Sequence, residues 1–149
     1  MKNVAIYYRT SKKFPNQENM QKVKCREYCK LNKLKIFKEY SDLNTKGYIR
    51  KRKALNQLLE ESNNFSEVIV YSIDRLARKV NILNDVDSIL KKKNITLTSV
   101  TQKFDSITPE GIFAKGLHFL LAEYEGAVTS KRTKDGLRAK KIRKENSHV

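Results

Sequence analysis

Short apolar segments alternate with segments of helical periodicity along the first hundred residues, and this order limits the fold more than any other feature. Four segments have the β-branched and aromatic composition of strands, at 2–8, 33–40, 67–71 and 95–100. Helical spacing of apolar residues falls between them, at 18–31, 52–63 and 79–92. Strands that alternate with helices predict an α/β fold, a mostly parallel central sheet with helices on both faces.

The last third of the chain predicts one long helix. Thr108-Pro109 is a typical helix start, and Phe113, Leu117, Leu120, Tyr124 and Val128 follow at spacings of three or four. A helix of this length is too long for a small domain to bury, so we expect its apolar stripe to pack against a second copy of the chain. The chain then divides into an α/β catalytic core at 3–108, a long helix at 109–144 and a disordered tail at 145–149.

Charge is concentrated in the second half of this helix. The chain carries 32 Lys and Arg against 16 Asp and Glu, and residues 131–144 hold eight of the basic residues and one acid. Such an excess favours a polyanionic partner. We expect nucleic acid, or less often an anionic membrane surface, contacted by the basic stretch that includes Lys131, Arg132, Lys134 and Arg138. A solvated basic tail is the other interpretation.

Other sequence features indicate where in the cell the protein is expected. No run approaches the roughly 18 apolar residues of a membrane span, which argues against an integral membrane protein. The N-terminal segment lacks the small-residue cleavage site of a signal peptide, so the cytoplasm is expected. Cys25 and Cys29 are too few for a disulfide scaffold, and we expect them to pack in the core or on the helix surface.

Polar residues follow two of the strands and suggest chemistry on a phosphate. Arg9 and Ser11 follow the first strand, and Asp74, Arg75 and Arg78 follow the third. Working residues of parallel sheets gather at the carboxyl ends of strands. Arginine offers a planar, permanently charged fork that matches phosphate oxygens, so a serine among arginines is a plausible centre for phosphoryl transfer without a metal. Surface arginines beside a loop serine are the structural alternative.

Several motifs in the same order resemble the catalytic domain of the serine recombinases, the resolvase/invertase family of site-specific DNA recombinases. VAIYYRTS resembles the family's first strand with its Y-x-R-V-S signature, and VIVYSIDRLARKV resembles its L-D-R-L-x-R signature. The resemblance implies that Ser11 is the nucleophile and Arg9 a phosphate-binding arginine, with Arg52, Asp74, Arg75 and Arg78 also catalytic. It assigns supporting roles to Gln21, Asp42 and Glu125.

The resemblance implies a metal- and ATP-independent transesterification. The serine attacks a phosphate of double-stranded DNA, forms a 5′-phosphoserine link and frees a 3′-hydroxyl, which later attacks back. No cofactor is expected. The partners are DNA and further copies of the chain, a homodimer that becomes a tetramer during strand exchange.

Two departures leave an alternative open. Gly126 occupies the position where the family has an arginine after Glu125, and no separate DNA-binding domain follows the long helix in this sequence. A catalytically weak or inactive recombinase-like dimeric DNA-binding module is therefore the alternative. A Mg²⁺-dependent nuclease using Asp42, Asp74 and Asp105 is a further one, which the adjacent arginines disfavour.

Overall fold

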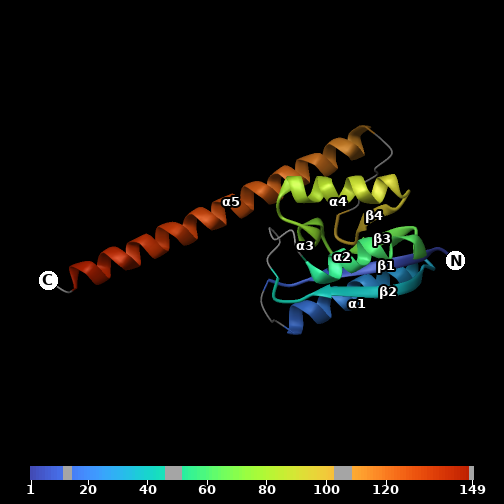
Figure 1. Cartoon of the computed structure of the whole chain (residues 1–149), viewed down its shortest axis with the longest axis horizontal. Helices are drawn as coiled ribbons and strands as arrows, with labels where there is room; N and C mark the ends of the chain where they lie inside the picture. The colour runs from blue at the N-terminus through green and yellow to red at the C-terminus, as the bar shows by residue number, and fades with distance from the viewer. Residues whose placement is uncertain (12–14, 46–51, 103–108, 148–149) are drawn as a thin grey trace.

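The structure, a computed structural model, describes residues 1–11, 15–45, 52–102 and 109–147. Its centre is a four-stranded sheet of order β2-β1-β3-β4, in which all the paired strands are parallel (Figure 1). The strands are β1 (Asn3–Arg9), β2 (Lys35–Asp42), β3 (Glu67–Val70) and β4 (Thr96–Ser99). All four coincide with predicted strands to within a few residues, and the parallel α/β fold is confirmed.

The central strand β1 separates two layers of packing. Val4, Ile6 and Tyr8 join Cys25 and Cys29 in one buried cluster, whereas Ala5 and Tyr7 belong to the cluster on the other face. This alternation follows from the two-residue repeat of a strand. Arg9 has the same parity as Tyr7 and therefore continues the second face, where the functional residues lie.

Helix α1 (Pro15–Leu31) covers the first face of the sheet (Figure 1). Its inward residues are Gln21, Cys25 and Cys29, all nearly inaccessible to solvent, so the core position of the cysteines is confirmed. The apolar residues Met20, Val23 and Leu31 of this helix are exposed instead, whereas Tyr28 is half-buried against the same cluster. The small thiols fit closely against Val4, Ile6 and Tyr8, and this packing decides which face turns inward.

The second face is covered by α2 (Lys53–Glu60), α3 (Ile73–Leu76) and α4 (Val80–Lys92), followed by α5 outside them (Figure 1). Helix α2 is shorter than the predicted 52–63, because its last turn is a separate 3-10 helix at Ser62–Asn64. The single turn α3 was not predicted, since four residues carry too little periodicity.

Helix α5 (Pro109–Asn146) is one continuous helix of 38 residues. It runs beside α4 and then extends far beyond the sheet (Figure 1). The helix continues two residues past the predicted end at 144, so Glu145 and Asn146 of the segment 145–149 are helical, and 148–149 lie outside the described residues. Asp105, one of the carboxylates of the metal-dependent alternative, also lies outside them.

The attachment of α5 to the core is polar as well as apolar. Phe119 is buried, and Lys115 Nζ lies 2.7 Å from Asp87 Oδ1 of α4 and 5.7 Å from the centre of the Phe119 ring. Asp87 also pairs with Lys91. Within the described part of the chain, no helix is long and apolar enough to cross a membrane.

Candidate active site

The ends of β1, β2 and β3 bring the predicted residues to one edge of the sheet. Because β1 pairs in parallel with both β2 and β3, their carboxyl ends lie side by side. Ser11 lies two residues after the end of β1 and is half-buried, and α3 follows β3. Residues more than 60 positions apart in sequence therefore share this edge.

Arg9 connects the loops at this edge. Its side chain is fully buried, and its N–H groups donate to three backbone carbonyls: Thr45 at 2.8 Å, Asp74 at 2.7 Å and Arg75 at 2.9 Å. Burial, followed by the charge of Arg78, lowers the pKa of Arg9 to about 10. The guanidinium keeps its charge at neutral pH and holds the segments after β1, β2 and β3 together.

Gln21 holds the backbone that precedes the serine. Its Oε1 accepts from the Arg9 N–H at 3.4 Å, and its Nε2 donates to the Arg9 carbonyl at 3.2 Å. The amide thus pairs with the end of β1 as a neighbouring strand would, and fixes the chain two residues before Ser11.

Asp42 organises the start of α2. Its carboxylate accepts from the backbone N–H groups of Ala54 and Leu55 at 2.9 and 3.0 Å and from the Tyr7 hydroxyl at 2.8 Å. A carboxylate at a helix N-terminus satisfies N–H groups that have no partner within the helix. Asp42 therefore fixes α2 immediately after Arg52, the residue that precedes its first turn.

Arg52 is buried with unused donors. One of its terminal N–H groups donates to the Leu76 carbonyl, and its guanidinium lies 5.7 Å from the centre of the Tyr7 ring. Nε and the other terminal nitrogen have no hydrogen-bond partner among the described residues. Buried donors without a partner are costly, so this position suits an anionic ligand.

The remaining predicted residues of this edge lie on and after α3. Arg75 is half-buried, and its Nε lies 3.7 Å from Asp74 Oδ2, close enough for an ion pair and too far for a hydrogen bond. Asp74 accepts a short hydrogen bond from the Ser72 hydroxyl. Arg78 is half-buried directly after α3, near enough to lower the pKa of Arg9. Positive charge is therefore gathered at the edge of the sheet that carries Ser11, and such charge suits a phosphate ligand.

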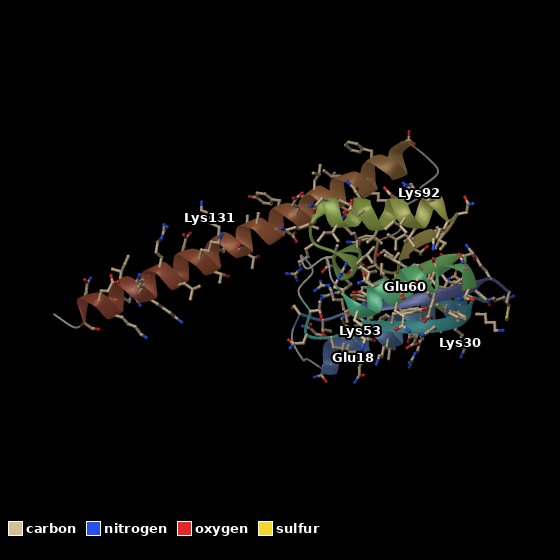
Figure 2. All side chains as sticks on the ribbon, in the orientation of Figure 1. Glu18, Lys30, Lys53, Glu60, Lys92 and Lys131 are labelled. Carbon is tan, nitrogen blue, oxygen red and sulfur yellow. The ribbon has the colours of Figure 1, made fainter. Side chains whose placement is uncertain are left out.

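Five predicted residues lie apart from this cluster, on α5. Glu125 is exposed, and its backbone carbonyl accepts from the Thr129 hydroxyl at 2.9 Å. Lys131, Arg132, Lys134 and Arg138 are exposed on the part of α5 that extends beyond the core, where Figure 2 labels Lys131.

Sequence reasoning missed two contributors to the edge. Tyr7 is one of them, because its hydroxyl donates to Asp42 and its ring lies beside the Arg52 guanidinium. Burial raises the pKa of Tyr7 far above its ordinary value, so it remains a hydrogen-bond donor. Its place two residues before Arg9 on β1 was the available signal. The second is Gln102, which follows β4 and whose side-chain oxygen accepts a hydrogen bond from the first N–H of α3. No spacing in the sequence indicates this contact.

Comparison with known proteins shows which family the chain belongs to. The model of the resolvase N-terminal domain matches residues 4–146, nearly the whole chain. The chain belongs to the resolvase N-terminal domain family. A probable DNA-invertase of Sinorhizobium fredii is 35% identical over 97 residues, which cover 65% of this chain and 32% of that protein. A putative DNA recombinase of Bacillus subtilis is 34% identical over 108 residues, or 71% of this chain and 21% of that protein.

The chain thus spans a third or less of these two relatives' lengths. Solved structures agree on the fold. The N-terminal catalytic domain of TP901-1 integrase is 26% identical with a TM-score of 0.66, over 87% of this chain and 98% of that one. A resolvase-family site-specific recombinase from Streptococcus pneumoniae has a TM-score of 0.64 at 19% identity, over 98% and 99% of the two chains. The resemblance read from the motifs is therefore confirmed at the level of family and fold.

Proposed function

We propose that this chain is the catalytic domain of a site-specific DNA recombinase that cuts and rejoins DNA by serine transesterification. The Ser11 oxygen attacks a backbone phosphorus and loses its proton, while the bond to the 3′ oxygen breaks and that oxygen leaves as a 3′-hydroxyl. The product is a 5′-phosphoserine ester. In the rejoining step a 3′-hydroxyl attacks this ester and releases the serine, so one phosphoester replaces another and no ATP or metal is required.

One observation carries the proposal: a half-buried serine shares an edge of the sheet with a buried arginine whose two further donor atoms lack partners among the described residues. Attack on a phosphodiester builds negative charge on its non-bridging oxygens. A desolvated guanidinium held beside that position stabilises this charge far more than water does. The DNA-invertase and DNA-recombinase names of the relatives support the same reaction class.

The roles follow the geometry. Arg9, Arg52, Arg75 and Arg78 stabilise charge on the phosphate. Asp74 orients Arg75, and Asp42 holds α2 so that Arg52 faces the edge. Gln21 steadies the strand end before Ser11. In this arrangement the carboxylates orient cations rather than accept protons.

The partners in this proposal are double-stranded DNA and further copies of the chain. The basic end of α5, comprising Lys131, Arg132, Lys134 and Arg138, contacts the DNA backbone. The apolar stripe of α5 joins two copies into a dimer, because Phe113, Leu117, Leu120 and Tyr124 are between 46% and 72% exposed in the single chain. Two dimers form the tetramer in which strands exchange, in the cytoplasm.

A suicide DNA substrate tests the reaction, because a nick beside the cut site lets the leaving strand diffuse away. The protein is fused to a DNA-binding domain of known target and incubated with EDTA. Wild type becomes covalently attached to the 5′ end at the cut site, and Ser11→Ala does not. Cleavage that EDTA abolishes and Ser11→Ala leaves unchanged would instead indicate a metal-dependent nuclease.

A DNA-binding module with little or no cleavage is the second candidate, and Gly126 is the observation that favours it. The family resemblance places an arginine there, and Glu125 beside it is exposed rather than in the arginine cluster. A Cβ at position 126 would meet nothing within 4 Å, so a side chain fits. If wild type forms no covalent product while Gly126→Arg does, this second candidate describes the natural chain.

A further inference from the structure

Helix α3 is too short to hold its own conformation. It comprises the four residues Ile73–Leu76, and a single turn makes too few internal hydrogen bonds to offset the entropy of ordering it. Its orientation decides where Arg75 points, so its stability must come from external contacts. These contacts lie at both of its ends.

The carboxyl end of α3 is held by arginines of the site. Arg9 donates to the carbonyls of Asp74 and Arg75, and Arg52 donates to the carbonyl of Leu76. Three consecutive carbonyls are therefore occupied by guanidinium groups. Cations at the carboxyl end of a helix also oppose its dipole favourably.

The amino end of α3 is held by Gln102. Its side-chain Oε1 accepts from the Ile73 N–H at 3.1 Å. Ser99, the last residue of β4, fixes Gln102 in turn. The backbone N–H of Gln102 donates to Ser99 Oγ, and the Ser99 hydroxyl donates to Gln102 Oε1 at 3.3 Å. Ser99 is 4% exposed and pairs with Val70 of β3, so the chain of contacts runs from the sheet to the first N–H of α3.

We propose that Gln102 is a positioning residue for the proposed reaction: it fixes the amino end of α3 and thereby the direction in which Arg75 presents its guanidinium. The inference rests on the proposed function. Ile73 N–H requires an acceptor and nothing more, so glutamate at 102 serves as well as glutamine, and its charge suits a helix N-terminus. Leucine has a similar size and offers no acceptor.

The first measurement is the single-turnover rate of covalent complex formation on saturating suicide substrate. Gln102→Leu lowers this rate about tenfold, Gln102→Glu restores it, and the affinity for DNA stays unchanged in both. In an Arg75→Lys background, Gln102→Leu adds little further loss, because both changes act on the same guanidinium. An unchanged rate in Gln102→Leu, or losses that multiply fully in the double variant, would overturn the assignment.

A matched control separates positioning from general stability. Asn32 Nδ2 donates to the Tyr28 carbonyl at 2.8 Å, at the far end of α1, and Asn32→Ala removes a comparable side-chain contact. Asn32→Ala lowers the Tm and leaves the cleavage rate unchanged. If it slows cleavage as much as Gln102→Leu does, the effect is one of global stability and the proposal fails.

Hydrogen exchange of the Ile73 amide tests the same contact without any reaction. In the unbound protein, exchange is about tenfold faster in Gln102→Leu than in wild type, and Gln102→Glu restores the protection. Should Gln102→Leu not fold, Ser99→Ala serves, since it removes the hydroxyl that fixes Gln102. Equal protection in wild type and variant would exclude the contact. Absence of any covalent product in wild type, with the exchange result intact, would instead count against the proposed reaction alone.

Discussion

The sheet edge and α5 differ in whether their side chains find contacts within the same chain. At the edge, Arg9, Gln21 and Asp42 are buried, and each makes two or more hydrogen bonds within the same chain. Along α5, beyond the contacts of Lys115 and Phe119 with the core, the basic side chains and most of the apolar ones are exposed. The edge satisfies most of its buried polar groups within one chain and leaves donors of Arg52 without a partner among the described residues, whereas α5 leaves most of its side chains exposed.

This difference shows where each region takes its structure from. The edge depends on long-range contacts, so one substitution there disturbs several loops. Helix α5 depends on its own backbone hydrogen bonds, so its exposed side chains can change with little effect on folding. Substitutions in the two regions should therefore separate reaction and stability from binding and assembly.

The largest effect is expected at the edge. Arg52→Ala removes both free donors and the contact with the Leu76 carbonyl, and it should slow covalent complex formation by about 10²–10³-fold, the range found when one preorganised donor is removed. The single-turnover assay on a suicide substrate measures this. Lys53→Ala, an exposed neighbour, is the control. Equal rates in the two variants would contradict the role of Arg52.

The second effect concerns the basic end of α5. Changing Lys131, Arg132, Lys134 and Arg138 to glutamine should weaken DNA binding roughly 100-fold at physiological salt and make the log–log salt slope less steep by about 3 to 4. Fluorescence anisotropy over a salt series measures both. The Tm should not change, because all four side chains are exposed. An unaltered slope would mean that these residues do not contact phosphates.

The apolar stripe comes third. Leu120 is 59% exposed in the single chain, and its burial between two copies is worth about 2 kcal/mol. Leu120→Ala should therefore weaken the dimer about 30-fold, as sedimentation equilibrium would measure. Leu137→Ala, at a residue 63% exposed on the basic part of the helix, should leave the dimer intact. Equal dissociation constants for both variants would place the dimer interface elsewhere.

The smallest effect is expected where α5 attaches to the core, at Asp87 of α4. Burial raises the pKa of the Asp87 carboxyl, but the hydrogen bonds from Lys115 and Lys91 outweigh burial, so the pKa lies below its ordinary value. The folded state therefore gains stability that is complete above the unfolded pKa of about 4 and is lost as the pH falls further. Denaturant unfolding at pH 7 and pH 3 should show a smaller difference between the two pH values for Asp87→Asn than for wild type. An identical difference would exclude this contribution.

Several features could be predicted because they depend on local pattern. The two-residue and three-to-four-residue repeats located the four strands and the long helix, and strand order placed Ser11, Asp74 and Arg75 at one edge. The inward face of α1 could not be decided from spacing alone, because Met20, Val23 and Leu31 satisfy the helical repeat about as well as Gln21, Cys25 and Cys29 do. Packing against β1, which is not encoded locally, selects between them.

The linear sequence was sufficient for the alternation of elements, the family and the concentration of positive charge at the end of α5, since these follow from periodicity, motif order and composition. It was insufficient for the partners of the buried arginines. Arg9 donates to the carbonyls of Thr45, Asp74 and Arg75, and Gln102 accepts a hydrogen bond from the first N–H of α3. These contacts require segments up to 66 residues apart in sequence to meet at one edge of the sheet. Such contacts form only after the chain has folded, because hydrogen bonds act over about 3 Å and carry no trace in residue spacing.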